Sequence, residues 1–219
     1  MKMRTAEWIV LGIVILSFIL GVIMFDRMPE QMASHWNIRN EVNGFMSRFW
    51  GLFFAPILLL GLFVLFLLIP RIDPLKRNIE TFRTHFQRFI MLLFLFLLYL
   101  YVVTIAWNLG HRFVMIQFLA PGFALLLFFC GVLLERTKRN WSVGIRTPWT
   151  LSSDRVWDGT HRLGGRLFKI AGVLCLGGTA FPRYALYFIL VPVLLAAACA
   201  AVYSYREYQK EPKEEPASK

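Results

Sequence analysis

Residues 140–166, NWSVGIRTPWTLSSDRVWDGTHRLGGR, form a polar, tryptophan-rich stretch in a chain that is otherwise mostly apolar. Within this stretch Asp154, Trp157, Asp158 and His161 are spaced so that all four share one face of a helix. Two carboxylates and an imidazole on one face could hold a divalent metal. We favour the alternative, a helix at the membrane interface. In this alternative Asp158 pairs with Arg162, and the tryptophans lie at headgroup level.

A turn precedes this helix. Gly144 and Pro148 bracket an arginine and a threonine, and Ser152 or Ser153 can cap the helix that then begins. Arg146, between two tryptophans, can form a bidentate pair with a carboxylate or a phosphate. Its partner would be either an acidic group of another protein or a lipid phosphate, and lipid contact is the more common case. The chain lacks the glycine-rich phosphate loop and the GxSxG, HExxH and CxxC signatures, so we expect no enzyme activity and no cofactor.

The elements that must position these residues are membrane helices. The chain has 219 residues, of which 58% are hydrophobic, and a mean hydropathy of +0.57, beyond the range of ordinary soluble domains. Several uncharged runs are close to the roughly 20 residues that cross a bilayer. We therefore predict an all-α integral membrane bundle of about six transmembrane helices, at 8–25, 49–70, 89–108, 113–134, 167–182 and 184–204. The first helix is expected to be retained, because its apolar run exceeds that of a signal peptide.

Basic residues indicate the orientation of the bundle. Of the 24 lysines and arginines, 19 fall in the N-terminus, in 71–88, in 135–169 and in the tail, and only five fall in the alternate connections. The positive-inside rule therefore places both termini in the cytoplasm. The net charge of +11 is spread over separate inner loops, which argues against direct nucleic-acid binding. The inner-face docking candidates are Asn140, Gly144, Arg146, Thr147, Pro148, Trp149, Trp157 and His161.

The outer loop 26–48 is the only sizeable external segment. Met28-Pro29 is expected to end the first helix, and Asn43-Gly44 is a strong turn signal. His35 could sense pH or bind a metal together with His111, but a tryptophan–histidine pair at the interface is the structural alternative. The outer-face binding candidates are Pro29, His35, Trp36, Asn37 and Gly44.

The organisation of the chain follows from these spans. We divide it into a helix pair with its outer loop, a basic amphipathic segment with a second helix pair, a C-terminal part with the polar stretch, and a charged tail that we expect to be disordered. The amphipathic segment is expected to continue into the third span along the headgroup region. In chain order, the helix pair with its outer loop is 1–70, the basic segment with the second helix pair is 71–134, the part with the polar stretch is 135–205, and the charged tail is 206–219.

The polar stretch at 140–166, with the following Leu-Phe, closely resembles the signature of the SdpI family of bacterial membrane proteins. The outer stretch MPEQMASHWNIRNEVNGFMSR resembles the small domain of unknown function that often precedes it. The resemblance implies a six-helix protein of the bacterial cytoplasmic membrane. The founding member of the family is an immunity protein against a secreted killing peptide, and it also captures a transcriptional repressor at the membrane.

Three functions remain open from the sequence. The favoured one is a non-enzymatic immunity and signalling protein that meets a secreted toxic peptide outside and a repressor inside, with membrane lipids as its other partners. The second is a transporter or channel, although no acidic residue lies at mid-depth in a span. The third is an enzyme at the lipid interface that uses Asp154, Asp158, His161 and Arg146.

Overall fold

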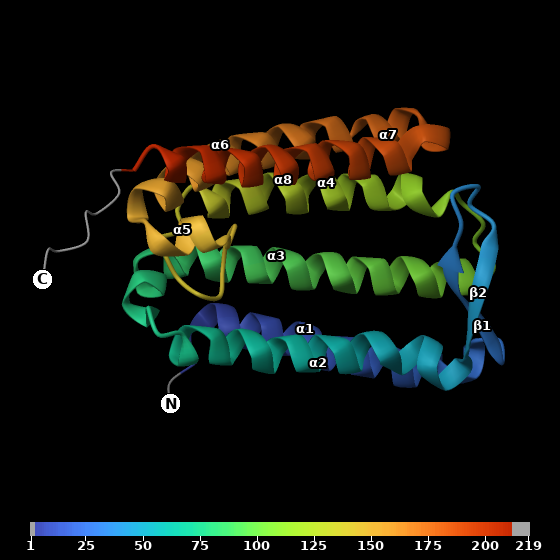
Figure 1. The fold of residues 1–219 in the computed structure, drawn as a ribbon. Coiled ribbons are helices and arrows are strands. Elements are labelled where there is room, and N and C mark those ends of the chain that lie inside the picture. Colours follow the sequence, from blue (N-terminus) through green and yellow to red (C-terminus); the bar gives the residue numbers. More distant parts are fainter. Residues whose placement is uncertain (1–2, 212–219) are drawn as a thin grey trace, which may run out of the picture.

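Six segments in the described part of the chain are helical, long and apolar enough to cross a membrane. The computed structural model describes residues 3–211, and Figure 1 shows their course. The spans contain helices α1 (Thr5–Met24), α2 (Arg48–Ile72), α3 (Lys76–Asn108), α4 (Met115–Leu134), α6 (Asp154–Cys175) and α8 (Ala185–Gln209). The shorter elements are η1 (Phe25–Arg27), β1 (Gln31–Trp36), β2 (Val42–Ser47), α5 (Pro148–Ser152), α7 (Gly177–Ala180) and η2 (Pro182–Tyr184). The predicted helical membrane bundle is confirmed.

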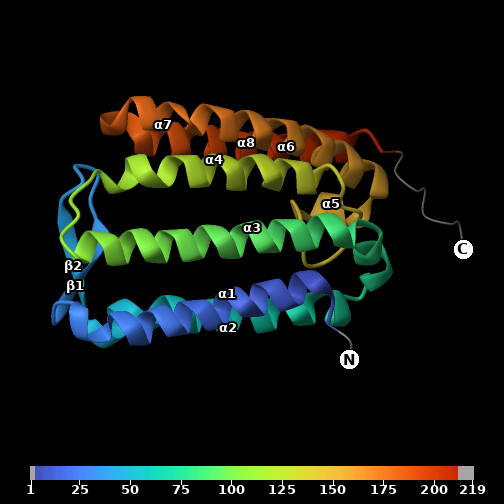
Figure 2. The same cartoon turned by 180° about the vertical axis from the view of Figure 1, so that it is seen from behind.

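The spans form two groups, which meet where α3 packs against α4. Helices α1, α2 and α3 contact one another, and α4, α6 and α8 form the second group. Helix α1 begins and α8 ends at the same end of the bundle, next to α5, whereas β1 and β2 lie at the opposite end (Figures 1 and 2). We call these two ends the terminal end and the hairpin end.

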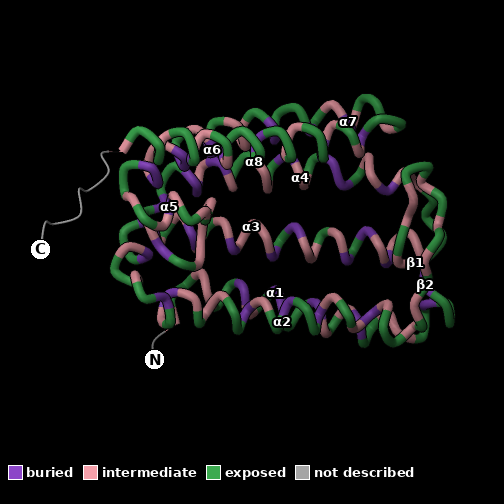
Figure 3. The backbone as a smooth tube through the Cα atoms, in the orientation of Figure 1, coloured by how far each residue is buried: buried purple, intermediate pink, exposed green. Residues whose placement is uncertain are grey.

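Apolar side chains cover much of the outside of the spans. Val22 is 67% exposed and Leu194 is 64% exposed, and Figure 3 shows that exposed positions recur along the outer helices. Such surfaces are unfavourable in water but suit the hydrocarbon of a bilayer. The chain is accordingly built with lipid as its surrounding solvent.

Phenylalanines of α3 fill the core of the first group. Phe82, Phe86 and Phe94 are nearly fully buried and pack with Val10 of α1 and Leu59 of α2. The predicted continuity of the basic amphipathic segment with the third span is confirmed. Its apolar face, however, packs against α1 and α2 rather than against headgroups, because the neighbouring helices extend far enough to cover it.

Helix α6 differs most from the expectation. We predicted a short helix to about His161 and a separate span from residue 167, but α6 runs without a break over Asp154–Cys175. Gly165 lies where α6 crosses α4, and a Cβ at this position would be 2.7 Å from the carbonyl oxygen of Gly131. Paired glycines let two helix backbones approach closely, as in other membrane helices. The first half of this span therefore belongs to the polar stretch.

The outer loop is a two-stranded antiparallel hairpin, and the predicted turn at Asn43-Gly44 is wrong. These two residues lie inside β2, where Gly44 pairs with His35 and a Cβ on Gly44 would be 2.8 Å from the Cβ of His35. The chain reverses between the strands instead, because the side chain of Asn37 accepts hydrogen bonds from the backbone N–H groups of Arg39 (2.9 Å) and Glu41 (3.0 Å). The glycine thus serves cross-strand packing, not the turn.

Helix α8 packs on α6 through small residues. Ala196 and Ala200 are buried, and their spacing of four residues places two small side chains on the same face of the helix. The helix continues to Gln209, so the tail predicted from residue 206 begins later than expected. The predicted disorder of residues 212–219 lies outside the described residues.

Candidate functional site

The polar stretch folds at the terminal end around a buried asparagine. Asn140 is fully buried, and its amide nitrogen donates to the carbonyl oxygens of Lys138 (2.8 Å) and Val143 (2.9 Å). Its side-chain oxygen accepts from the backbone N–H groups of Ser142 (2.9 Å) and Val143 (2.6 Å). All four hydrogen-bonding positions of the amide hold the turn that leads to Gly144, so Asn140 shapes the site rather than facing a partner.

His161 fixes the same turn from α6. Its ring is 1% exposed and stacks on Trp157 with ring centroids 3.9 Å apart. The Nε2 atom accepts a hydrogen bond from the N–H of Ile145 (2.9 Å), and Nδ1 donates to the carbonyl oxygen of Trp157 (2.8 Å). These two bonds require a neutral ring with its proton on Nδ1. Both nitrogens are therefore occupied, and the ring is closed to metal ligation and to proton transfer.

Helix α5 closes the turn on its other side. Thr147 caps α5 by accepting from the N–H of Thr150, and Pro148 occupies the first helical position. Thr147 also lies 3.3 Å from the hydroxyl of Ser204, and the ring of Trp149 packs edge-on against Tyr205 of α8. The turn is thus attached to both α6 and α8. The predicted serine cap of α6 is confirmed, because Ser153 accepts from the N–H of Val156.

Two residues that the sequence analysis missed connect this turn to the first helix group. Asp73, after α2, is 3% exposed and accepts hydrogen bonds from Leu75 N–H (2.7 Å), Trp141 N–H (3.0 Å) and the Ser142 hydroxyl (2.6 Å). Asn78 of α3 donates to the carbonyl oxygen of Arg139 (2.7 Å). In the sequence, the position of Asp73 directly before Pro74 could have drawn attention to it. No neighbouring residue, however, indicates that its partners are Trp141 and Ser142.

Asp154, Asp158 and His161, the metal ligands of the less favoured alternative, do not come together. Among residues 3–211, no group of three or more His, Cys, Asp and Glu side chains is placed to hold a metal ion. Asp154 forms an ion pair with Arg139 (2.8 Å), and Asp158 pairs with Lys138 (2.9 Å) rather than with Arg162 as predicted. Trp157 is fully buried rather than at headgroup level. These side chains do not form one site because the loop that precedes α6 covers Trp157 and His161 and leaves the carboxylates of Asp154 and Asp158 outside.

Neutralising Asp158 should therefore have little effect. The Asp158–Lys138 pair is exposed, with side-chain exposures of 43% and 55%, and such pairs contribute less than about 1 kcal/mol. We expect Asp158→Asn to change the thermal unfolding midpoint of the purified protein by no more than a few degrees. A larger change would contradict the assignment of Asp158 to this single exposed pair.

The exposed part of the terminal-end surface is basic. Arg146 is exposed, and its guanidinium donates to the carbonyl oxygen of Trp141, whose ring is also exposed. We use the name signature surface for the exposed residues of this loop and of α5, Trp141, Arg146 and Pro148. It offers one cation and an aromatic ring to a partner. Of the other inner-face candidates, Asn140, Trp157 and His161 are buried, and Gly144, Thr147 and Trp149 are partly exposed.

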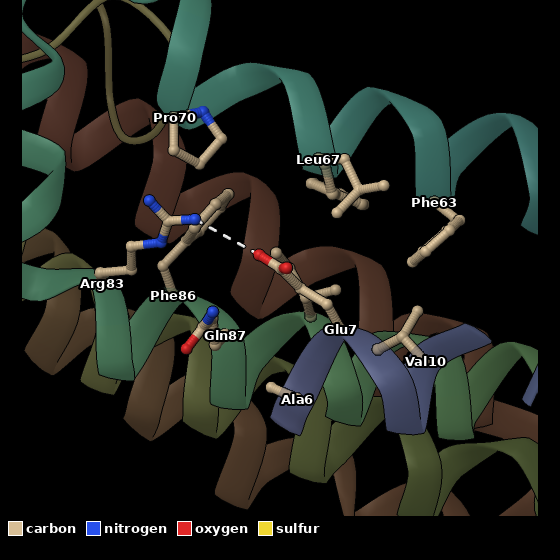
Figure 4. Close-up of a pocket in the computed structure, with 11 residues that line it drawn as sticks. Ala6, Glu7, Val10, Phe63, Leu67, Pro70, Arg83, Phe86 and Gln87 are labelled. Carbon is tan, nitrogen blue, oxygen red and sulfur yellow. Dashed lines mark hydrogen bonds and ion pairs between the residues drawn. The ribbon is translucent and has the colours of Figure 1, made fainter. Parts of the chain in front are cut away.

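A further cavity at the terminal end lies between α1, α2 and α3. Figure 4 shows Arg83 reaching towards Glu7, with Pro70 and Phe86 beside them, and the Arg83–Glu7 distance is 3.3 Å. The cavity measures about 20 Å³, which is room for one water molecule. The Nε of Arg83 and the Nε2 of Gln87 are buried in this region without a protein partner, and a single water can satisfy both. We assign this cavity a structural role.

The hairpin end contains a larger groove. A hollow of about 240 Å³ lies between the hairpin, α3, α4 and the start of the last span. Of the outer-face candidates, His35, Trp36 and Asn37 line this hollow, together with Thr104 and Arg183. Pro29 is exposed outside it, and Gly44 serves cross-strand packing. We call this hollow the hairpin groove.

Trp36 is the most unusual residue of the hairpin groove. Its ring packs edge-on against Trp107, with centroids 5.3 Å apart, while its Nε1 is buried and has no hydrogen-bond partner in the described structure. A buried indole N–H without an acceptor is unfavourable by about 1–3 kcal/mol. An acceptor that enters the groove would remove this cost. The histidine beside it, His35, hydrogen-bonds Asn43 of the opposite strand.

Two asparagines position the hairpin over the helices. Asn108, at the end of α3, accepts from the N–H of Ala33 (2.8 Å) and donates to its carbonyl oxygen (3.1 Å). Asn40, with a φ of +62°, accepts from the N–H of Met115 (2.7 Å) and donates to the carbonyl oxygen of Phe113 (3.3 Å). The hairpin is therefore attached to both helix groups, and the groove between them has a defined shape.

Known proteins resemble both parts of the chain. Residues 136–205 match the SdpI/YfhL protein family, and residues 12–60 match a domain of unknown function, DUF1648. The chain is 26% identical over 199 residues to the Immunity protein SdpI of Bacillus subtilis (strain 168). The aligned residues cover 90% of this chain and 93% of that protein. No solved structure matches it. The chain is thus similar to the SdpI family over its C-terminal part and to DUF1648 over its N-terminal part, and its six apolar helices are those of a multi-pass membrane protein.

Proposed function

We propose that this protein is a non-enzymatic immunity protein that protects its cell from a secreted toxic peptide. The similarity to an immunity protein supports the general role. The observation that carries the proposal is the hairpin groove, one of whose lining residues is Trp36, with a buried Nε1–H that has no acceptor among the described residues. By the positive-inside rule the hairpin end faces the outside, where a secreted peptide arrives.

The chemistry of the groove suits a peptide. Its walls are mainly apolar, from Leu100, Met115, Ile116 and Leu119, and a few polar side chains stand at the hairpin side. Such a combination binds an apolar side chain and orients the backbone next to it. In our proposal a peptide carbonyl oxygen accepts the hydrogen bond of Trp36 Nε1 while an apolar side chain fills the 240 Å³ hollow.

We propose further that the signature surface docks a transcriptional repressor in the cytoplasm. Arg146 stands exposed there, and a guanidinium can bind a carboxylate of a partner in bidentate fashion. Trp141 beside it supplies an aromatic ring of the kind enriched at protein interfaces. Removal of the charge in Arg146→Gln is expected to weaken capture of the repressor without changing protection.

The experiment for the groove uses a strain that is sensitive to secreted toxic peptide from the culture medium of the source bacterium. Expression of the protein should raise the dose that kills half of the cells. The Trp36→Phe variant keeps an aromatic side chain but removes the pyrrole part of the indole with its N–H, and should lower that dose about fivefold or more, the equivalent of one lost buried hydrogen bond. Trp50→Phe is the matched control, because Trp50 is 52% exposed on α2 and does not line the groove.

The two parts of the proposal can fail separately. A wild-type protein that gives no protection, although it is present in the membrane, contradicts the immunity function. If the wild type protects and Trp36→Phe behaves like Trp50→Phe, the function stands and the groove is not the contact site.

A further inference from the structure

A second hollow lies on the lipid-facing side of the hairpin groove. It measures about 560 Å³ and shares Ile38, Asn40 and Arg183 with the groove. Its other walls include Arg39 from the hairpin turn and two tyrosines, Tyr184 and Tyr187. Both tyrosines are more than half exposed at the start of the last span. Tyrosines at the end of a span are typical of the headgroup level of a bilayer.

This hollow continues into the membrane. A third hollow of about 280 Å³ shares Tyr187 with it and is otherwise lined by Leu174, Phe188, Val191 and Pro192. At 1.5 Å per residue, Pro192 lies about 13 Å further along the span than Arg183. Tyr187 lines both hollows, so a ligand that passes this side chain would follow a path from a basic end at headgroup level to an apolar end in the hydrocarbon.

The basic end has no counter-charge within the protein. Among the described residues neither Arg39 nor Arg183 forms an ion pair, and no acidic residue lines either hollow. Arg183 lies over the ring of Tyr184 at 6.0 Å, a contact of the same kind as that of Arg48 with Phe25 (5.5 Å) and longer than that of Arg112 with Trp107 (3.6 Å). Two guanidinium groups at one hollow match the charge and geometry of a phosphate.

We propose that these two hollows bind an anionic phospholipid. Its phosphate lies between Arg39 and Arg183, and the upper part of an acyl chain follows Tyr187 and Val191 into the third hollow. This ligand fits both ends of the path at once, whereas a free phosphate would use only the basic end. The lipid would then form one wall of the hairpin groove, because Arg183 lines both.

The test is native mass spectrometry of the full-length protein from mixed micelles with equal amounts of phosphatidylglycerol and phosphatidylcholine. We expect the wild type to retain phosphatidylglycerol preferentially. Arg39→Gln and Arg183→Gln should each weaken its retention about fivefold, and the double variant roughly twentyfold, as expected for one cation each at a membrane surface. Val191→Trp fills the apolar hollow without changing charge and should also reduce retention.

Arg112→Gln is the matched control, because it removes a cation from the same end of the bundle outside the two hollows. Equal retention of both lipids by the wild type would overturn the proposal. So would a loss in Arg112→Gln as large as that in Arg183→Gln, since the preference would then reflect only general surface charge. Displacement of the lipid by millimolar inorganic phosphate would show an anion site without a lipid site.

Discussion

Replacing Gly144 with alanine is expected to lower the free energy of unfolding by about 3 kcal/mol. Two effects add at this position. The backbone has a φ of +127°, a conformation that residues with a side chain rarely adopt, and a Cβ would lie 2.4 Å from the Nε2 of His161. The turn would have to move away from His161, and the hydrogen bond from Ile145 N–H would be lost. Denaturant unfolding in detergent micelles, followed by tryptophan fluorescence, measures the loss.

Gly110 provides a control that separates the two effects. Its φ is +106°, but a Cβ there would meet nothing within 4 Å. Gly110→Ala should therefore cost only the backbone strain, about 1 kcal/mol. Equal losses in the two variants would mean that contact with His161 contributes nothing, which would contradict the close packing of the turn on this ring.

Removal of the Asp73 side chain has the second large effect. Asp73→Ala should destabilise the protein by about 3 kcal/mol, because it leaves buried donors at Trp141 and Ser142 without their charged acceptor. Asp73→Asn keeps one acceptor oxygen but turns the other into a donor, so roughly half of the loss is expected. The signature loop should also become sensitive to limited proteolysis, since its bonds to Asp73 are part of what attaches it to the first helix group.

Asp154→Ala serves as the comparison for Asp73. Its side chain is 72% exposed and pairs only with Arg139, so its loss should cost less than about 1 kcal/mol. If Asp73→Ala were as stable and as resistant to protease as Asp154→Ala, the buried hydrogen bonds would not hold the two helix groups together.

The sequence predicts those features of the fold that depend on neighbours in the chain. Uncharged runs are sufficient to find five of the six spans because the cost of burying charge in hydrocarbon is large and local. The remaining span, predicted at 167–182, contains Lys169, and its helix begins earlier, at Asp154. A cap at Ser152 or Ser153 is predictable because the acceptor role of a cap reaches only three residues ahead, and the structure assigns it to Ser153. The hairpin was missed because Asn43-Gly44 is a stronger turn signal than Asn37, and only the pairing of Gly44 with His35 decides between them.

The candidate site depends on contacts that are distant in the chain. Helical spacing correctly places Asp154 and Asp158 next to Trp157 and His161, but it does not say which of them a loop will cover. Here the loop that ends at Ile145 covers His161 and leaves the carboxylates in exposed ion pairs. The partners of Asp73 lie 68 and 69 residues away, so spacing alone does not reveal them.

Helix α3 connects the two ends of the molecule in a mechanical sense. At one end of α3, Asn108 hydrogen-bonds the hairpin, and at the other end Asn78 hydrogen-bonds the loop before the signature turn. The helix between them contains no proline. Thirty residues of helix span about 45 Å and resist bending. A tilt of α3 that displaces Asn108 would therefore also displace Asn78, because one continuous helix joins the hairpin end to the terminal end.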